Sequence, residues 1–401
     1  MNITGIITEY NPFHKGHLYH LKSAIKTTNS DAIVCVMSGN FVQRGGPAII
    51  DKYKRAEIAI LNGVDLVLEL PCYYSVSSAE FFAKGSVSIL HSIGVVNNIF
   101  FGSECGDIEK LKLIANFLTN ESEEFKLEIK NNLDSGLTYA KARELSINKF
   151  LKEDNLKDIL KSSNNILGIE YIKALIRLNS NITPLTLKRQ GSNYNDKELS
   201  SNFSSATSIR EFLKNNKNLD ELNNYLPAAT INYLKDLKNS NYNFVFEKDM
   251  YKYIKYRILS NNINFNNLQE IKEGLDNKIL KEIYSSISFE DFILKIKSKR
   301  YTYTKISRLL TQIFLSFDSY NYKELLDEKN LYARVLAFNG KGKKILKEMK
   351  KNSQIPIITK ISKKNINPLL NLDINATKAY SILNNSLNPL SDFLNSPIIK
   401  D

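Results

Sequence analysis

Two histidines, His14 and His17, have the residue types and spacing that point most directly to chemistry. They flank Gly16 in the run His14-Lys15-Gly16-His17, and three of the four histidines of the chain fall within residues 14–20. Imidazoles can donate hydrogen bonds to phosphate oxygens whose negative charge grows in a transition state. The glycine keeps a side chain out of the way of a bound ligand. The spacing therefore predicts a phosphate-handling site with His14 and His17 as its catalytic residues.

The segments around these histidines place them at the start of a helix. Residues 3–7 are rich in β-branched side chains and bounded by turn residues, which predicts a short buried strand. The pair Asn11-Pro12 then breaks any regular continuation. From His17 onward, apolar residues recur at helical spacing. Because a helix N-terminus offers backbone N–H groups and the positive end of the helix dipole, phosphate binds there readily.

Two other interpretations of the histidines compete with this one. Two exposed histidines at a helix start can have no function at all, and histidines also bind zinc. Zinc-binding histidines usually have carboxylate or thiolate partners at helical spacing, and Glu9 alone does not complete such a set. Cys35, Cys72 and Cys105 are scattered, which indicates reduced thiols rather than a disulfide framework or a metal cluster. We therefore expect no metal site built by the protein.

The first half of the chain alternates strand-like and helix-like segments. Such alternation predicts an α/β fold, a parallel sheet with helices on both faces. Ligands bind such sheets at the carboxyl ends of the strands, where the strand order reverses. The histidine run, residues 38–40, Pro71 and Gly102 all follow predicted strands, so we expect one cleft to collect them. The strands are predicted at 3–7, 32–37, 66–70, 98–101 and 186–189, and the helices at 52–61, 79–91 and 170–178.

The pattern changes near residue 211, which predicts two domains. Residues 1–210 form the first, with a charged helical insertion at about 107–160, and residues 211–401 form a second domain of helices joined by Asn-rich connectors. Residues 191–196 are predicted to be a loop. Residues 204–210 open a helix, where Ser and Thr side chains cap the helix or, if the helix is uncapped, its backbone N–H groups and Arg210 hold a phosphate.

Positive charge is concentrated in the second half. The net charge is +13; residues 1–210 hold 24 Lys and Arg against 22 Asp and Glu, whereas residues 211–401 hold 31 against 20. This asymmetry indicates a polyanionic partner for the second half, although a Lys-rich composition is the simpler source of some of it. Residues 298–317 are predicted to be one helix, in which basic residues interleave with tyrosines as in RNA-binding surfaces, or which is simply amphipathic with a basic polar side. Its candidate RNA-binding residues are Lys299, Arg300, Lys305 and Arg308.

The chain shows no sign of a membrane or a secretory route. No stretch approaches about 20 uninterrupted apolar residues, so no membrane span is predicted. The predicted first strand leaves no room for a signal peptide before it. We therefore expect a cytoplasmic protein. A second basic run, at residues 341–351, follows a predicted turn at Asn339-Gly340.

Several longer motifs resemble one family. The run His14-Lys15-Gly16-His17 resembles the HxGH signature of the nucleotidyltransferase superfamily, which is related to class I aminoacyl-tRNA synthetases. The wider set is similar to the tRNA(Met) cytidine acetate ligase family and covers nearly the whole chain. The motifs that carry this similarity are Glu9-Tyr10-Asn11-Pro12-Phe13-His14-Lys15-Gly16-His17, Ser38-Gly39-Asn40-Phe41-Val42-Gln43-Arg44-Gly45 with Pro47, Asp65-Leu66-Val67-Leu68-Glu69-Leu70-Pro71, Phe101-Gly102-Ser103-Glu104, Asn165-Ile166-Leu167-Gly168, Lys299-Arg300-Tyr301-Thr302 and Tyr332-Ala333-Arg334-Val335-Leu336.

The resemblance implies a HUP/Rossmann-like ATP-binding domain followed by a mainly helical, basic tRNA-binding domain. It also implies a reaction: ATP activates acetate as acetyl-adenylate, and the acetyl group passes to the N4 amine of the wobble cytidine of elongator tRNA(Met). Mg²⁺ is expected with the triphosphate, held mainly by phosphate oxygens and water. Asn40, Lys15 and Arg210 are weaker candidates for the same site. The implied ATP-binding residues are Ile7, Thr8, Glu9, Tyr10, Asn11, Pro12, Phe13, His14, Lys15, Gly16, His17, Leu18, Tyr19, His20, Gly102, Asn165 and Arg189.

The sequence departs from the superfamily pattern at one point, and two alternative functions stay open. A second, lysine-containing signature used by some superfamily members has no counterpart beyond residues 204–210, so the residues that hold pyrophosphate stay unassigned. The first alternative is a small-molecule nucleotidyltransferase; such enzymes are usually shorter and need no basic helical domain. The second is a non-catalytic RNA-binding protein, for which the crowded histidines have no obvious use.

Overall fold

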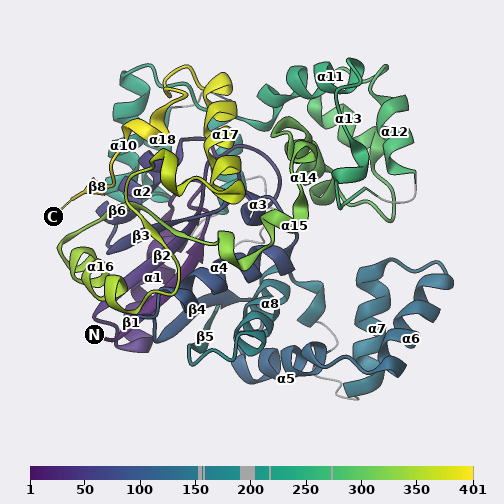
Figure 1. The fold of residues 1–401 in the computed structure, drawn as a ribbon, viewed down its shortest axis with the longest axis horizontal. Helices are drawn as coiled ribbons and strands as arrows, with labels where there is room; N and C mark the ends of the chain where they lie inside the picture. The colour runs from purple at the N-terminus through teal and green to yellow at the C-terminus, as the bar shows by residue number, and fades with distance from the viewer. Residues whose placement is uncertain (152–155, 157–158, 190–203, 216–217, 272–273, 401) are drawn as a thin grey trace.

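The centre of the protein is a twisted, mainly parallel sheet (Figure 1). The structure, a computed structural model, describes residues 1–151, 156, 159–189, 204–215, 218–271 and 274–400. Within these residues the strands form one sheet of order β5-β4-β1-β2-β3-β6-β7, with β8 beside β6. The strands are β1 (Ile3–Thr8), β2 (Ala32–Ser38), β3 (Leu66–Leu70), β4 (Asn98–Ser103), β5 (Thr183–Lys188), β6 (Ala333–Phe338), β7 (Ile357–Ile358) and β8 (Ile398–Ile399).

The strand order reverses at β1. The chain moves outward from β1 through β2 to β3, then returns to place β4 on the other side of β1 and β5 beyond it. All the pairings among β1 to β5 are parallel, which confirms the predicted α/β fold. Since crossing helices leave a crevice where the order reverses, the carboxyl end of β1 is the expected place for a ligand.

Helices flank the sheet and extend beyond it (Figure 1). Those of the first half are α1 (Lys15–Thr28), α2 (Lys52–Leu61), α3 (Cys72–Ser75), α4 (Ala79–Ser92), α5 (Ile108–Thr119), α6 (Glu123–Asp134), α7 (Tyr139–Leu151), α8 (Ser163–Arg177) and α9 (Ala206–Lys214). Those of the second half are α10 (Ala228–Asn239), α11 (Tyr251–Leu259), α12 (Leu275–Glu282), α13 (Phe289–Ile296), α14 (Tyr303–Phe314), α15 (Tyr322–Leu325), α16 (Gly340–Asn352), α17 (Pro368–Leu383) and α18 (Ser391–Leu394). The paired helices α6 and α7 project at the side of α5, and α11 to α14 form a separate group of helices.

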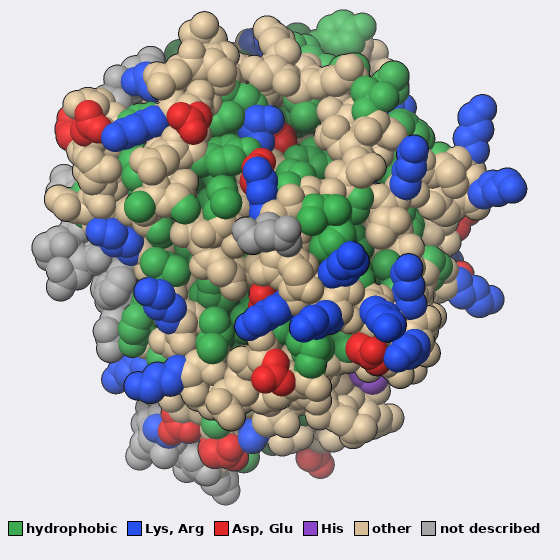
Figure 2. All heavy atoms as spheres, turned by 90° about the vertical axis from the view of Figure 1, so that its left-hand side faces the viewer, with side chains coloured by type: hydrophobic (Ala, Val, Ile, Leu, Met, Phe, Trp, Pro, Cys, Tyr) green, Lys and Arg blue, Asp and Glu red, His purple; other side chains and the backbone are tan. Residues whose placement is uncertain are grey.

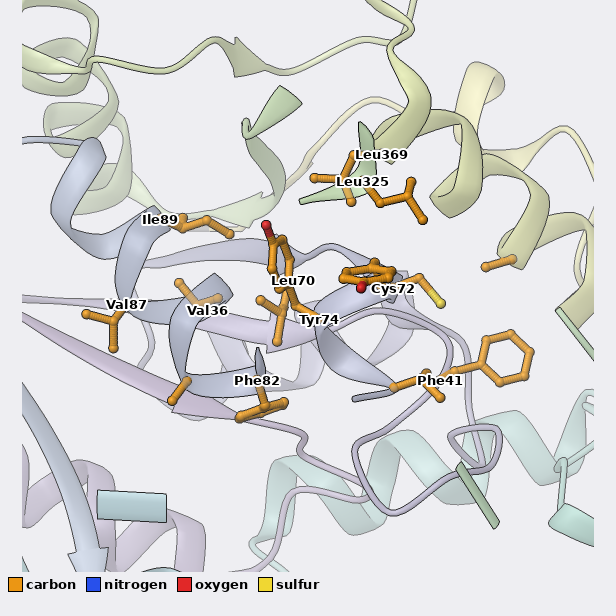
Figure 3. Packing of buried hydrophobic residues seen from close by; sticks show 14 of the residues in the cluster. Val36, Phe41, Leu70, Cys72, Tyr74, Phe82, Val87, Ile89, Leu325 and Leu369 are labelled. Carbon is orange, nitrogen blue, oxygen red and sulfur yellow. The ribbon is translucent and has the colours of Figure 1, made fainter. Parts of the chain in front are cut away.

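The two halves of the chain share a hydrophobic core. One buried cluster includes Leu70 on β3 and Tyr74 on α3 together with Leu325 on α15 and Leu369 on α17 (Figure 3). Full burial of such a side chain contributes about 1.5–3 kcal/mol. The second half is therefore packed against the sheet and is not merely tethered to it.

Two predictions for the second half were wrong: that its segments are helices joined by connectors, and that one helix covers residues 298–317. Residues 333–338 form β6, which pairs antiparallel with β3 and places Arg334 opposite Glu69, so the sheet does not end at residue 210. The predicted helix over residues 298–317 begins only at Tyr303, because the Thr302 side chain accepts the Lys305 N–H and caps it. The predicted loop at residues 191–196 lies outside the described residues.

Candidate active site

A cavity of about 430 Å³ opens where the strand order reverses. Its volume lies within the range of sites that bind small molecules and cofactors. Both halves of the chain contribute to it, since α14 supplies Thr304 and Arg308. From the predicted ATP-binding set, the residues that line it are Ile7, Thr8, Glu9, Tyr10, Asn11, His14, Gly16, His17, Tyr19, His20, Gly102 and Arg189.

The histidine pair is organised by the first turn of α1. His14 is the N-cap residue, and its backbone N–H donates to Nδ1 of His17, three residues later, at 3.3 Å. The two imidazoles stack with their ring centroids 3.7 Å apart. Because Nδ1 of His17 accepts this bond, the proton of the neutral ring is assigned to Nε2. The helix start thus fixes both the orientation and the tautomer of His17.

Aromatic residues of the preceding loop hold this pair in place. Tyr10 and Phe13 are both buried, and their ring centroids lie 5.0 and 5.7 Å from that of His17. Tyr10 has φ of 46°, a left-handed conformation that a residue with a Cβ atom rarely adopts. Strained backbone of this kind persists where the surrounding packing determines it and is concentrated at functional sites.

Burial keeps the three cavity histidines neutral. Loss of contact with water, together with the positive charge of Arg189, lowers the pKa of His14 to about 3 and that of His20 to about 4; Arg210 also acts on His14. Burial, the neighbouring histidines and Arg189 hold the pKa of His17 well below its usual value. At pH 7 these rings donate and accept hydrogen bonds without carrying charge.

Two ring nitrogens of cavity residues have no hydrogen-bond partner among the described residues. Nδ1 of His14 and Nε2 of His20 are buried and make no hydrogen bond within that part of the chain. Buried polar atoms are almost always satisfied, so an unsatisfied pair on two residues that line one cavity indicates a ligand that satisfies it. Neutral rings, unpaired nitrogens and a helix N-terminus together fit a polyphosphate.

The remaining predicted ATP-binding residues fall into two groups. Gly102 and Arg189 meet at the ends of β4 and β5, where a Cβ atom on Gly102 would lie 3.2 Å from Cγ of Arg189, so the glycine lets this arginine cross the strand end. Asn165 does not line the cavity. Its amide oxygen accepts hydrogen bonds from the backbone N–H groups of Glu104 and Cys105, at 2.9 and 3.1 Å. The predicted residues that do not line the cavity are Pro12, Phe13, Lys15, Leu18 and Asn165.

The expected cleft does not collect all the strand ends. Residues 38–40 and Pro71 do not line the cavity. The Asn40 side chain is buried, accepts the Lys52 backbone N–H at 2.8 Å and donates to Thr377 at 3.2 Å. These segments instead lie beside a buried ionic cluster, formed by Lys52, Glu69, Arg334 and Asp392.

Arg210 and Lys15, two weaker candidates, support the cavity from outside. Arg210 donates to the carbonyl oxygen of Asn11 at 2.9 Å and so ties α9 to the histidine loop. The backbone N–H of Lys15 donates to the carbonyl oxygen of Tyr225 at 2.9 Å. Neither side chain is among those that line the cavity. Both residues therefore connect the loop to later parts of the chain.

The four predicted tRNA-binding residues have different environments, two of them before α14 and two on it. Lys299 and Arg300 are exposed ahead of the helix. Lys305 is partly buried, with Nζ 5.0 Å from the centroid of the Tyr301 ring. Arg308 lines the cavity, and its Nε lies 3.3 Å from Oε1 of Glu270. This last placement could not be inferred from the sequence, because it depends on how α14 packs against the first half.

The loop after β2 supplies cavity residues that belong to one of the family motifs but were not predicted as site residues. Gln43 and Arg44 line the cavity, and Ser307 Oγ donates to the carbonyl oxygen of Gly45 at 2.8 Å. Gly45 has φ of 83°, and a Cβ atom there would lie 2.3 Å from the backbone nitrogen of Arg308. Only glycine fits this close approach. The paired glycines of this loop were the available sequence signal.

The second basic run lies at the opposite end of the strands. It forms α16, whose neighbours are the starts of β2 and β3: Lys341 Nζ donates to the carbonyl oxygen of Asp31, and the Asn339 N–H to that of Asp65. Figure 2 shows many Lys and Arg side chains on this face of the molecule. The exposed lysines of the helix are Lys341, Lys343, Lys344, Lys347, Lys350 and Lys351.

The described part of the chain has neither a metal-binding group nor a membrane-crossing helix. Among these residues, no group of three or more His, Cys, Asp or Glu side chains is arranged to hold a metal ion. In the same ranges, none of the helices has both the length and the apolar character that a membrane crossing requires.

A parallel sheet whose first strand leads through an H-x-G-H loop into a helix defines a nucleotidyl transferase type of α/β protein. The family model described as HIGH Nucleotidyl Transferase matches residues 1–392. A tRNA(Met) cytidine acetate ligase of Clostridium novyi is 55% identical over 99% of each chain, and one of Clostridium tetani is 50% identical over 100% of each. Thermotoga maritima TmcAL, in a crystal structure with alpha-thio ATP, aligns with a TM-score of 0.90 and 32% identity over 100% of this chain and 99% of that one.

These similarities extend over the whole chain and are not confined to the histidine loop. The apo form of the Thermotoga maritima protein aligns with a TM-score of 0.91. The chain belongs to the tRNA(Met) cytidine acetate ligase family of the HIGH nucleotidyl transferases, and it is an enzyme. The resemblance seen in its motifs is thereby confirmed.

Proposed function

We propose that this enzyme joins acetate to the N4 amine of the wobble cytidine in elongator tRNA(Met), with ATP converted to AMP and pyrophosphate. The names of its relatives and the ATP analogue bound to its Thermotoga maritima neighbour support the substrates. The observation that carries the proposal is the pair of unsatisfied ring nitrogens, on His14 and His20, in a cavity at the start of α1. Its tRNA substrate implies action in the cytoplasm.

The first step forms acetyl-adenylate. A carboxylate oxygen of acetate attacks the α-phosphorus of ATP, the new O–P bond forms, and the bond to the β-phosphate oxygen breaks as pyrophosphate leaves. The bonds that form and break belong to acetate and ATP, so the protein contributes by positioning the reactants and stabilising charge. The neutral His17 ring donates from Nε2, and the His14 ring lies stacked against it. Both act where phosphate oxygens gain charge.

The nucleotide is proposed to lie on the β4 and β5 side of the histidines. Gly102 removes the side chain that would obstruct it, and Arg189 supplies a guanidinium group for a phosphate or a ribose hydroxyl. Arg210 keeps the Asn11 segment in position beneath it. Of the described residues that line the cavity, Glu9 alone is a carboxylate, so Mg²⁺ would be held chiefly by the phosphate oxygens and water.

The second step transfers the acetyl group. The N4 amine attacks the carbonyl carbon of acetyl-adenylate, the C–N bond forms, and AMP leaves with the electrons of the C–O bond. The wobble base must be unstacked to reach the cavity, as single-stranded loop bases are in sequence-specific RNA recognition. Lys299 and Arg300, exposed ahead of α14, are proposed to contact the tRNA phosphates.

Radiolabelled acetate tests the whole proposal. The purified enzyme is incubated with ATP, labelled acetate and a transcript of elongator tRNA(Met), and the RNA is digested to nucleosides. Label in N4-acetylcytidine supports the proposal, and a transcript with uridine at the wobble position is the matched control that should stay unlabelled. Absence of labelled nucleoside, together with pyrophosphate release in the presence of another small substrate, would instead make the enzyme a small-molecule nucleotidyltransferase.

A further inference from the structure

We propose that the β2 side of the cavity is the subsite for the acceptor nucleotide, where Glu9 takes the proton of the amine and Arg308 binds a phosphate of the same nucleotide. This inference rests on the proposed function and deepens it, because it assigns the two substrates of the second step to two ends of one cavity. It also names a residue for the proton that the acceptor amine must lose.

The sheet order separates the two ends of the cavity. Gly102 and Arg189 stand at the ends of β4 and β5, on one side of β1, whereas Gln43 and Arg44 follow β2 on the other side. The histidine loop follows β1 and therefore lies between them. Arg189 is close enough to act on the pKa of all three cavity histidines. With the nucleotide on the Arg189 side, the end near Gln43 is left for the other substrates.

Two hydrogen bonds position the loop that forms this second end of the cavity. Glu9 Oε1 accepts the backbone N–H of Gln43 at 2.9 Å. Two residues later, the carbonyl oxygen of Gly45 accepts from Ser307 Oγ at 2.8 Å, and the Gly45 backbone lies against that of Arg308. The Glu9 carboxylate and the Arg308 guanidinium are thus placed by the same short loop.

Helix α14 connects this end of the cavity with the exposed basic surface. Lys299 and Arg300 are exposed just before the helix, Thr304 and Arg308 line the cavity one turn apart, and Lys305 lies between them. An RNA strand held by the exposed residues therefore has a short route along the helix into the cavity. Arginine suits phosphate because its guanidinium group can donate two parallel hydrogen bonds. The ion pair of Arg308 with Glu270 orients that group.

Glu9 is the group in this subsite that can accept a proton. Among the described residues that line the cavity it is the one carboxylate, and Glu and Asp side chains commonly act as general bases. As the N4 nitrogen bonds to the acetyl carbon, its N–H proton passes to a Glu9 oxygen, and the C–O bond to AMP breaks. Proton transfer to a positioned base contributes about 10²–10⁴ in rate.

The two half-reactions separate this assignment from a role in adenylation. Acetate-dependent exchange of labelled pyrophosphate into ATP, without RNA, reports the first step. Single-turnover transfer of labelled acetyl from preformed enzyme-bound acetyl-adenylate to the tRNA transcript reports the second. If the wild-type enzyme acetylates no tRNA, the proposed function fails. If it does, the Glu9 and Arg308 variants decide this inference.

The Glu9→Gln variant tests the proton acceptor, since glutamine keeps an oxygen that can accept the Gln43 N–H. We expect transfer to fall by about 10² or more, and by at least tenfold more than exchange. Equal losses in exchange and transfer would overturn the assignment of Glu9.

The Arg308→Ala variant tests the phosphate contact. We expect the KM for tRNA to rise by about tenfold or more with a smaller effect on exchange, and Arg308→Lys to restore part of the loss. Arg177→Ala is the matched control, because Arg177 also pairs with a glutamate, Glu80, but does not line the cavity. A loss of exchange in both Arg308 variants, with retained fold by circular dichroism, would place Arg308 in the pyrophosphate site. Wild-type KM values in both would equally overturn the proposal.

Discussion

The cavity and the buried ionic cluster lie on neighbouring parts of one sheet, but they differ in how their buried polar groups are paired. In the cluster each charged group has opposite-charge partners: Lys52 Nζ lies 2.7 Å from Glu69 and 3.0 Å from Asp392, and Arg334 lies 3.0 Å from each of the same two carboxylates. In the cavity, ring nitrogens of two histidines have no hydrogen-bond partner among the described residues.

This difference separates structural from functional polar residues. Buried charges are tolerated when they are paired, and the cluster pairs Glu69 on β3 with Arg334 on β6, which fixes the register between the two halves of the chain. Unsatisfied nitrogens cost stability unless a ligand meets them. The cluster should therefore matter for folding and the cavity for activity, and this contrast can be tested one residue at a time.

The largest expected effect is on stability, in the ionic cluster. In Asp392→Asn, one negative charge remains for Lys52 and Arg334, and the free energy of unfolding should fall by about 3–5 kcal/mol. Urea denaturation followed by far-UV circular dichroism measures it, since the chain has no tryptophan.

A second buried aspartate provides the control for this experiment. Burial beside Glu69 raises the pKa of Asp373 to about 8, so this carboxyl group is largely protonated at neutral pH. It accepts the Cys72 N–H at 2.6 Å and is hydrogen-bonded to the Tyr332 hydroxyl. Asn resembles a protonated acid, so Asp373→Asn should cost less than about 1.5 kcal/mol. Equal losses in the two variants would show that charge pairing is not what stabilises this region.

The next effect is on activity, in the cavity. His14→Ala should reduce acetyl-adenylate formation by about 10²–10³ or more, because a stabilising group is lost where phosphate charge develops. Its tRNA affinity and its unfolding free energy should stay close to those of the wild type, because Nδ1 of His14 makes no hydrogen bond to any other described residue. Pyrophosphate exchange and filter binding measure the two properties.

His91→Ala is the control for the loss of a histidine. His91 lies on α4, where its Nδ1 is hydrogen-bonded to Oγ of Ser180 at 3.0 Å, and it does not line the cavity. Full adenylate formation in His14→Ala would remove the catalytic assignment. Unfolding of that variant on the scale expected for Asp392→Asn would remove the contrast between the two regions.

A smaller effect is expected from pH. The unfolded chain binds protons on histidine below its ordinary pKa of about 6.5, whereas folded His20 does so only near its lowered pKa of about 4. Stability therefore rises with pH between about 4 and 6.5, by up to about 1.4 kcal/mol per pH unit for this residue. His20→Gln should flatten that part of the profile in urea titrations at pH 4.5, 5.5 and 6.5. A profile parallel to that of the wild type would show that His20 titrates normally.

The sequence predicted the histidine loop well because its signals are local. The strand, the Asn-Pro break and the apolar spacing after His17 together specify a strand, a loop and a helix within about 25 residues. The α/β alternation was predictable for the same reason. Residues 333–338 were not recognised as a strand, because their partner, β3, lies more than 260 positions earlier in the chain.

The composition of the cavity was only partly predictable for a related reason. Asn165 belongs to a family motif, but its amide is used by the backbone of residues 104–105, and no sequence pattern indicates such a contact. Arg308 was predicted to contact RNA, and its place in the cavity depends on the contact of α14 with Gly45. Side-chain positions set by packing between distant segments have no local signature.

The smallest expected effect concerns the exposed residues ahead of α14. Arg300→Ala should weaken tRNA binding several-fold at moderate salt and lower the slope of log Kd against log salt concentration by about 0.7–0.9, as expected for one lost phosphate contact. Adenylate formation should not change, since Arg300 is exposed and does not line the cavity.

Lys344→Ala on α16 is the matched control, because it removes an equally exposed positive charge from the end of the sheet opposite the cavity. If Lys344→Ala lowers the salt slope and Arg300→Ala does not, the tRNA is bound on the face shown in Figure 2 and approaches the cavity from another direction. If only Arg300→Ala lowers it, the functional region extends from the unpaired cavity histidines along α14 to the protein surface. The paired charges of the ionic cluster then remain purely structural.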